Sequence, residues 1–112
     1  MTSRTERERN RRLRELATLA HERALDRALG QLFTHFQRWQ ARELDAFDLS
    51  HEVHRFHDKE GREIHSFHAV NTPVMVVVWA LVQGLLSREE AGELHPDVQR
   101  CLAFLDAQRD EK

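Results

Sequence analysis

The sequence predicts an all-α fold: a small helical bundle with a long N-terminal helix and a buried central helix. Two observations concern composition. The 112 residues include only four glycines and two prolines, too few turn residues for a many-stranded sheet. The chain is 40% hydrophobic and 32% charged, which is typical of a folded helical domain. The third observation is that apolar residues recur three or four positions apart along much of the chain. We therefore predict one helical domain over residues 1–112.

The first element is a long helix from Arg4 to about Glu43, a stretch without proline whose apolar residues keep helical spacing. A helix of about 40 residues would span about 60 Å at 1.5 Å per residue. The shorter segments that follow cannot cover that length, so we predict a homodimer or a subunit of a larger complex. The expected interaction residues are Leu29, Leu32, Phe33 and Phe36 from this helix, with Val78 and Trp79 from the central one.

The next segment follows a turn within residues 41–50. Asp48 or Ser50 is expected to cap its helix, because either side chain can accept a hydrogen bond from a free backbone N–H. Asp58–Gly61 admits two interpretations. It is either part of one continuous helix or a turn between two short helices, and the sequence does not choose between them.

The central helix has a clear start. Thr72 suits the N-cap and Pro73 the first helical position. Residues 74–86 are almost entirely apolar, which predicts a helix buried on every side.

Two shorter helices are expected after it. Ser87 and Glu90 form a capping box that opens a short helix to about Leu94. Pro96 begins the last helix, and residues 109–112 are expected to be a frayed tail. The residues of this helix that we expect to face inward are Val98, Cys101, Leu102 and Leu105.

Histidines are concentrated in one segment, with five of the eight between His51 and His68. On a continuous helix, at about 100° per residue, one stripe would hold His54, His57, His65 and His68. Imidazole binds zinc and other transition metals, and it also takes up protons near neutral pH. We hypothesise that these four residues bind a transition metal or a set of protons. The alternative is a structural role, because neither an HExxH motif nor a cysteine pair accompanies them.

Charge is unevenly distributed. Residues 1–14 hold six arginines and two glutamates, a formal charge of +4, and residues 1–12 are expected to be an exposed basic arm. Arg4–Arg14 could contact nucleic-acid phosphates, although the interleaved glutamates favour Arg–Glu pairs in solvent. Residues 43–68 hold seven acids and three bases, a formal charge of −4. The two segments could meet between antiparallel copies of the chain.

Several functional classes lack their signals. The sequence has neither a glycine-rich phosphate loop nor a GxSxG motif, and Cys101 alone cannot form an internal disulfide. The longest apolar run is shorter than the roughly 20 residues of a membrane helix, and the charged start does not resemble a signal peptide. We predict a cytoplasmic, non-enzymatic interaction protein without a cofactor: an adaptor, regulatory subunit or antitoxin-like partner that binds itself or another protein. The alternatives are a transition-metal protein, with zinc as the candidate, and a nucleic-acid binder.

Overall fold

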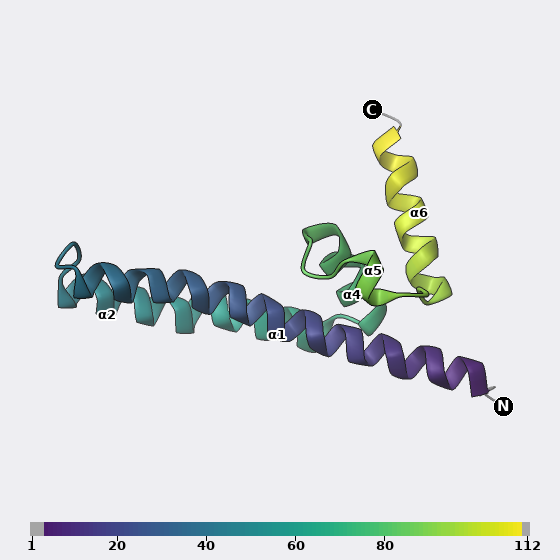
Figure 1. Cartoon of the computed structure of the whole chain (residues 1–112), viewed down its shortest axis with the longest axis horizontal. Coiled ribbons are helices and arrows are strands. Elements are labelled where there is room, and N and C mark those ends of the chain that lie inside the picture. The colour runs from purple at the N-terminus through teal and green to yellow at the C-terminus, as the bar shows by residue number, and fades with distance from the viewer. Residues whose placement is uncertain (1–3, 111–112) are drawn as a thin grey trace. The chain divides into compact units, whose positions relative to one another are not determined.

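The computed structural model describes residues 4–110, and these are largely helical. Its elements in chain order are α1 (Arg4–Gln40), α2 (Ala46–Arg55), the π-helical segment η1 (Phe56–Gly61), α3 (Arg62–Val70), α4 (Pro73–Gln83), α5 (Arg88–Ala91) and α6 (Pro96–Asp110) (Figure 1). Over this range the chain forms no strand, which confirms the all-α prediction. Parts of the predicted basic arm (1–3) and of the predicted frayed tail (111–112) lie outside the described residues. Among residues 4–110, a helix both long and apolar enough to span a bilayer is not found.

The predicted long helix is present as α1, and it ends three residues earlier than expected. Arg42 adopts the left-handed conformation, with φ of 65°. The amide of Arg42 donates to the carbonyl of Trp39 (3.1 Å), and the amide of Glu43 donates to the carbonyl of Arg38 (2.9 Å). These two bonds form a Schellman motif, which satisfies carbonyls that the helix end leaves open. The motif stops α1 and turns the chain towards α2.

Two of the predicted N-caps are confirmed and one is wrong. Thr72 accepts a hydrogen bond from the amide of Met75, and Ser87 accepts one from the amide of Glu90. The cap of α2, however, is Asp45, whose carboxylate accepts from the amide of Asp48 at 2.7 Å. The tight Schellman turn reverses the chain so quickly that α2 begins earlier than the predicted caps, Asp48 and Ser50.

The histidine-rich segment is one continuous helical path, so the interpretation with a turn at Asp58–Gly61 is wrong. The path includes one π-helical stretch, η1. A π turn accommodates an extra residue compared with an α turn, and therefore the faces of α3 are rotated relative to those of α2. Gly61 accommodates the close approach of the backbone in this π turn. A Cβ at this position would lie 3.2 Å from the carbonyl oxygen of Phe56, closer than an ordinary van der Waals contact.

The helices group into two compact units, which we describe separately. Within the described residues, unit 1 comprises residues 4–20 and 71–110, and unit 2 comprises residues 21–70. The helix α1 contributes to both. The single helical domain over residues 1–112 stays a prediction.

Unit 1 holds most of the large buried side chains. On α4 the buried residues are Val76, Val77, Val78 and Ala80, and the other elements contribute Leu13, Leu16, Ala20, Leu85, Leu86, Ala91, Val98 and Leu102. The prediction that the central helix is buried on every side is wrong, because Met75 is 47% exposed and Val82 54% exposed. Leu105, predicted to face inward, is 43% exposed, and Cys101 is half-buried. The few short helices of unit 1 leave part of α4 and the end of α6 uncovered.

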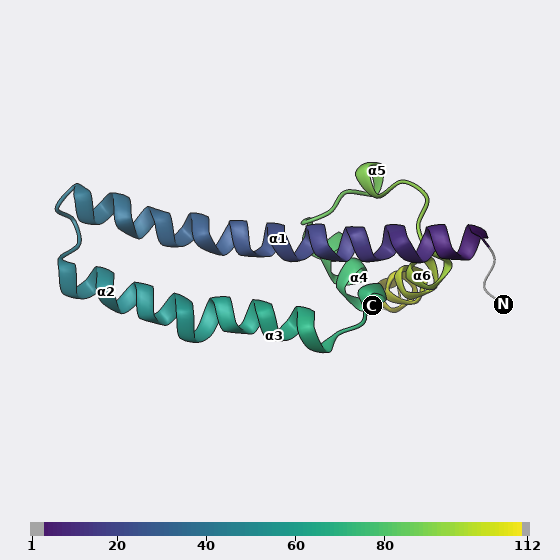
Figure 2. The same ribbon diagram turned by 90° about the horizontal axis from the view of Figure 1, so that it is seen from below.

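Unit 2 is a helical hairpin. The second half of α1 and the path α2–η1–α3 run antiparallel, side by side (Figure 2). Its buried residues are mainly small: Ala24 and Ala28 on α1, Leu49 on α2, and Gly61 in η1. Two helices packed through small residues approach closely, and their large apolar side chains are left at the edges of the contact.

Candidate functional site

The predicted interaction residues on α1 lie largely at the surface of unit 2. The exposed fractions are 47% for Leu29, 60% for Phe33 and 37% for Phe36. At about 100° per residue these three side chains share one sector of the helix, and we call them the α1 stripe. Leu32 is half-buried, beside the face of Ala24 and Ala28. The stripe is thus an apolar surface that the hairpin itself does not cover.

The two predicted interaction residues on α4 behave differently. Val78 is 3% exposed within the core of unit 1, so this side chain cannot contact a partner without local unfolding. Trp79 is half-buried. The pattern of the sequence could not separate these residues from the α1 stripe, because both sets are apolar with helical spacing.

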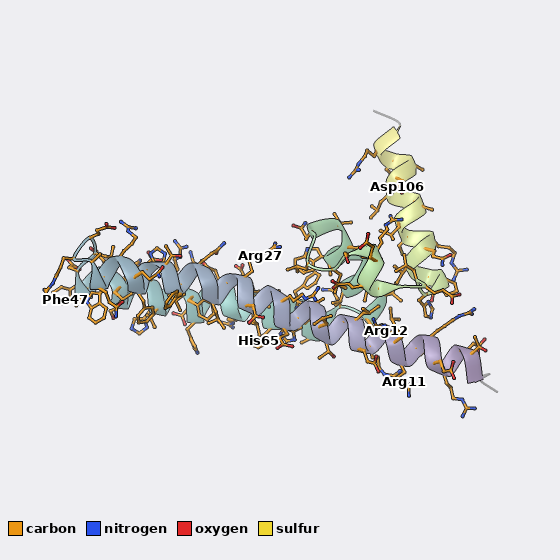
Figure 3. The ribbon with its side chains drawn as sticks, viewed as in Figure 1. Arg11, Arg12, Arg27, Phe47, His65 and Asp106 are labelled. Atoms are coloured by element: carbon orange, nitrogen blue, oxygen red, sulfur yellow. The ribbon has the colours of Figure 1, made fainter. Side chains whose placement is uncertain are left out.

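Other large side chains extend the exposed apolar surface of unit 2. Trp39 is 42% exposed one turn beyond the stripe, and Val53 on α2 is 38% exposed. Phe47, 87% exposed, lies at the end of the hairpin where α1 turns into α2 (Figure 3). We did not predict Phe47 as an interaction residue, because its position beside the turn gave no helical face to assign it to.

The structure does not bring the four predicted metal-ligating histidines together. His54 and His57 are exposed, and the ring of His57 lies 3.2 Å from the carboxylate of its neighbour Asp58. His65 and His68 lie instead with His21 of α1. Within residues 4–110, three or more histidine, cysteine, aspartate or glutamate side chains placed to hold a metal ion are not found.

The trio of His21, His65 and His68, here called the histidine cluster, joins α1 to α3. Nε2 of His21 lies 3.2 Å from Nδ1 of His65, and the two rings meet edge to face. The His21 ring also stacks on that of His68, with centroids 4.3 Å apart and planes 7° apart. Nδ1 of His68 hydrogen-bonds the carbonyl oxygen of Ile64 at 2.8 Å, which fixes the orientation of that ring.

Burial and the neighbouring imidazoles act together on His21. Desolvation lowers the pKa of His21 below its usual value, and His68 and then His65 lower it further by charge repulsion. Each effect disfavours the imidazolium form. The position of His21 therefore favours its neutral form.

The sequence contained a signal for His21 that we did not use. Leu13, Ala17, His21, Ala24, Ala28, Leu32, His35 and Trp39 follow one another at intervals of three or four residues. A histidine within such a stripe is expected at a helix contact. His35 occupies the same stripe, and its Nε2 lies 3.5 Å from the carboxylate of Glu52 on α2.

The predicted basic arm is partly docked in unit 1. Arg12 donates to the carbonyl oxygen of Glu90 at 2.9 Å, and Arg9 lies 4.0 Å from the carboxylate of Glu93. Arg11 pairs with Glu15 on the helix surface. The Arg11–Glu15 pair is of the Arg–Glu kind expected in solvent. The contacts with Glu90 and Glu93 come from a distant segment that the sequence did not indicate, and they engage part of the positive charge that a nucleic-acid interface would use.

A second contact ties α1 to α6 within unit 1. Nδ1 of His95 accepts a hydrogen bond from the amide of Asp97 at 3.1 Å. Nε2 therefore carries the proton and donates to the amide oxygen of Asn10 at 3.0 Å. His95 thus caps the first turn of α6 and holds it to α1.

Comparison of the chain with protein-family models, curated proteins and solved structures gave no match.

Proposed function

We propose that the protein is a non-enzymatic helical interaction protein that self-associates, and that the α1 stripe is its contact surface. The observation that carries the proposal is the exposure of Leu29, Phe33 and Phe36 on a unit that buries mainly small residues. A hairpin of two helices has only one internal contact. Its remaining apolar surface stays in water unless another molecule covers it.

Burial of the α1 stripe against a second copy would favour association. Full burial of a leucine or phenylalanine side chain contributes about 1.5–3 kcal/mol. Three partly exposed side chains on each of two chains could together supply several kcal/mol towards association. Part of this gain offsets the loss of translational and rotational freedom. Two hairpins that pair through such stripes would form a four-helix bundle, an architecture that buries the apolar faces of all four helices.

Charge favours a second copy as the occupant. Residues 1–14 carry a formal charge of +4 and residues 43–68 a formal charge of −4. One copy therefore carries both signs, with Arg9 and Arg12 partly engaged by Glu93 and Glu90 of their own chain. Exposed ion pairs contribute only about 0–1 kcal/mol each, so they would set the orientation more than the strength of the dimer.

The test is the mass of the protein in solution and its response to one charge in the stripe. Sedimentation equilibrium at micromolar concentration should give about twice the chain mass of 13.2 kDa. Phe33→Glu should give the mass of one chain, since two stripes would then place carboxylates in an apolar contact. Phe104→Glu is the matched control: Phe104, 63% exposed, lies on α6 outside the stripe, and its variant should remain dimeric. A wild-type monomer, or a dimeric Phe33→Glu variant, would contradict the proposal.

The alternatives remain predictions. These are a transition-metal protein that uses the histidines and a nucleic-acid binder that uses Arg4–Arg14, and the geometry favours neither over self-association. A role as adaptor, regulatory subunit or antitoxin-like partner, and a cytoplasmic location, likewise stay predictions.

A further inference from the structure

We propose that His21, His65 and His68 form a proton-responsive clasp between α1 and α3 of unit 2. The clasp accepts one proton with its contacts intact, and a second proton releases α3 from α1. The proposal goes beyond self-association, because it concerns a contact within a single chain.

The contact between His21 and His65 limits the number of protons. Their ring nitrogens lie 3.2 Å apart, so one nitrogen must carry a hydrogen and the other must offer a lone pair. Two neutral rings satisfy this requirement, and so do one neutral ring and one imidazolium. Two imidazolium rings would bring two N–H groups together, and the hydrogen bond would be lost.

The stacked pair of His21 and His68 also limits the number of protons that the cluster can hold. The rings of His21 and His68 have centroids 4.3 Å apart and are almost parallel. Two positive charges at this distance repel, and more strongly at a half-buried site than in open water. His68 cannot easily swing away, because Nδ1 is bonded to the Ile64 carbonyl and the ring of Phe67 meets it edge-on at 5.1 Å.

The groups around His21 also disfavour its protonation. The titratable groups of α3 that act on His21 are His68 and His65, and both lower its pKa, as does burial, which is the largest cause. His35 differs, because its neighbour is the carboxylate of Glu52, which can balance a positive charge. In the histidine cluster, by contrast, a protonated ring faces another imidazole.

The direction of the pH response follows from the lowered pKa of His21. When the clasp opens, His21 returns towards its usual value of about 6.5, so the open form binds protons more readily than the closed form. The clasp therefore stabilises unit 2 above about pH 6.5, and this contribution is lost as the pH falls through the lower pKa of the closed form.

Hydrogen exchange of the α3 backbone amides, corrected for the intrinsic pH dependence of exchange, tests the proposal on the full chain. We expect protection of residues 62–70 to fall between pH 7.5 and 5.5, with much of it lost at the lower pH, because the open form takes up protons that the closed form disfavours. His21→Gln should remove most of this pH dependence, because glutamine keeps hydrogen-bonding atoms but cannot be protonated. His65→Gln provides a second variant at an exposed position, where loss of folding is not expected. It should remove only part of the pH dependence, because His65 is the smallest of the three causes that lower the pKa of His21.

His57→Gln is the matched control. His57 is exposed on the same helical path, with a carboxylate neighbour in place of an imidazole, so its variant should keep the wild-type response. Protection of α3 that is unchanged at pH 5.5 in the wild type would overturn the proposal. The same fall in His65→Gln as in the wild type, or its loss in His57→Gln, would also overturn it.

Discussion

Val78 and Val82 lie one turn apart on α4 and differ sharply in exposure, at 3% and 54%. The two side chains lie on nearly the same face of the helix, so the difference reflects position along α4: Val78 is covered, and Val82, next to the last residue of the helix, is not. This pair separates the contribution of burial from that of helix propensity.

We expect Val78→Asp to unfold unit 1 or remove most of its stability. An unpaired carboxylate in an apolar site costs several kcal/mol, a large part of the roughly 5–15 kcal/mol that stabilises an ordinary domain. Val82→Asp places the same side chain at an exposed position, where substitutions usually change stability by less than about 0.5 kcal/mol. Urea denaturation followed by circular dichroism compares the two. Similar midpoints for both variants would show that α4 is not packed as described.

Arg42→Gly should stabilise the protein by up to about 1 kcal/mol. Arg42 holds a left-handed conformation at the end of α1, and glycine adopts this conformation without the clash that a Cβ causes. Arg42→Ala keeps the Cβ and serves as the control, with no comparable gain. The midpoints of thermal unfolding distinguish the two variants. Equal midpoints for glycine and alanine would mean that this backbone conformation is not strained.

His95→Ala should destabilise unit 1 by about 1–3 kcal/mol. The change removes a hydrogen bond to the amide of Asp97 and another to Asn10, and the half-buried Asn10 would lose a partner there. Asn10→Ala should reproduce part of the loss, while alanine at the exposed His57 should have little effect. Denaturant midpoints for the three variants provide the measurement. A wild-type midpoint for His95→Ala would exclude this anchor between α1 and α6.

The local features of the fold were predictable from the sequence. Thr72 and Ser87 cap their helices because a cap depends on the side chain and on the next few amides. The length of α1 likewise follows from an uninterrupted run of helix-forming residues. The cap at Asp45 was missed because it depends on where the preceding Schellman turn ends, and that motif uses an arginine where glycine is usual.

The histidine cluster was only half predictable. His65 and His68 were identified from their spacing, but their partner comes from a helix more than 40 residues earlier in the chain. The expected alignment with His54 and His57 also assumed a regular α-helix, and the π turn at η1 changes that register. The sequence also could not predict which apolar residues are exposed. Val78 and Phe33 are both apolar residues on helices, and only the three-dimensional packing shows that Val78 is buried and Phe33 exposed.

The central claim is that the α1 stripes of two copies meet. The most direct measurement is an isotope-filtered NMR experiment on a mixture of ¹³C-labelled and unlabelled protein, which detects contacts between chains only. The account predicts intermolecular contacts from the Leu29 methyl groups and from the rings of Phe33 and Phe36, and their loss in Phe33→Glu. Intermolecular contacts confined to Met75, Val82 or Phe104 of unit 1, or the absence of any at concentrations where the mass is that of a dimer, would contradict it.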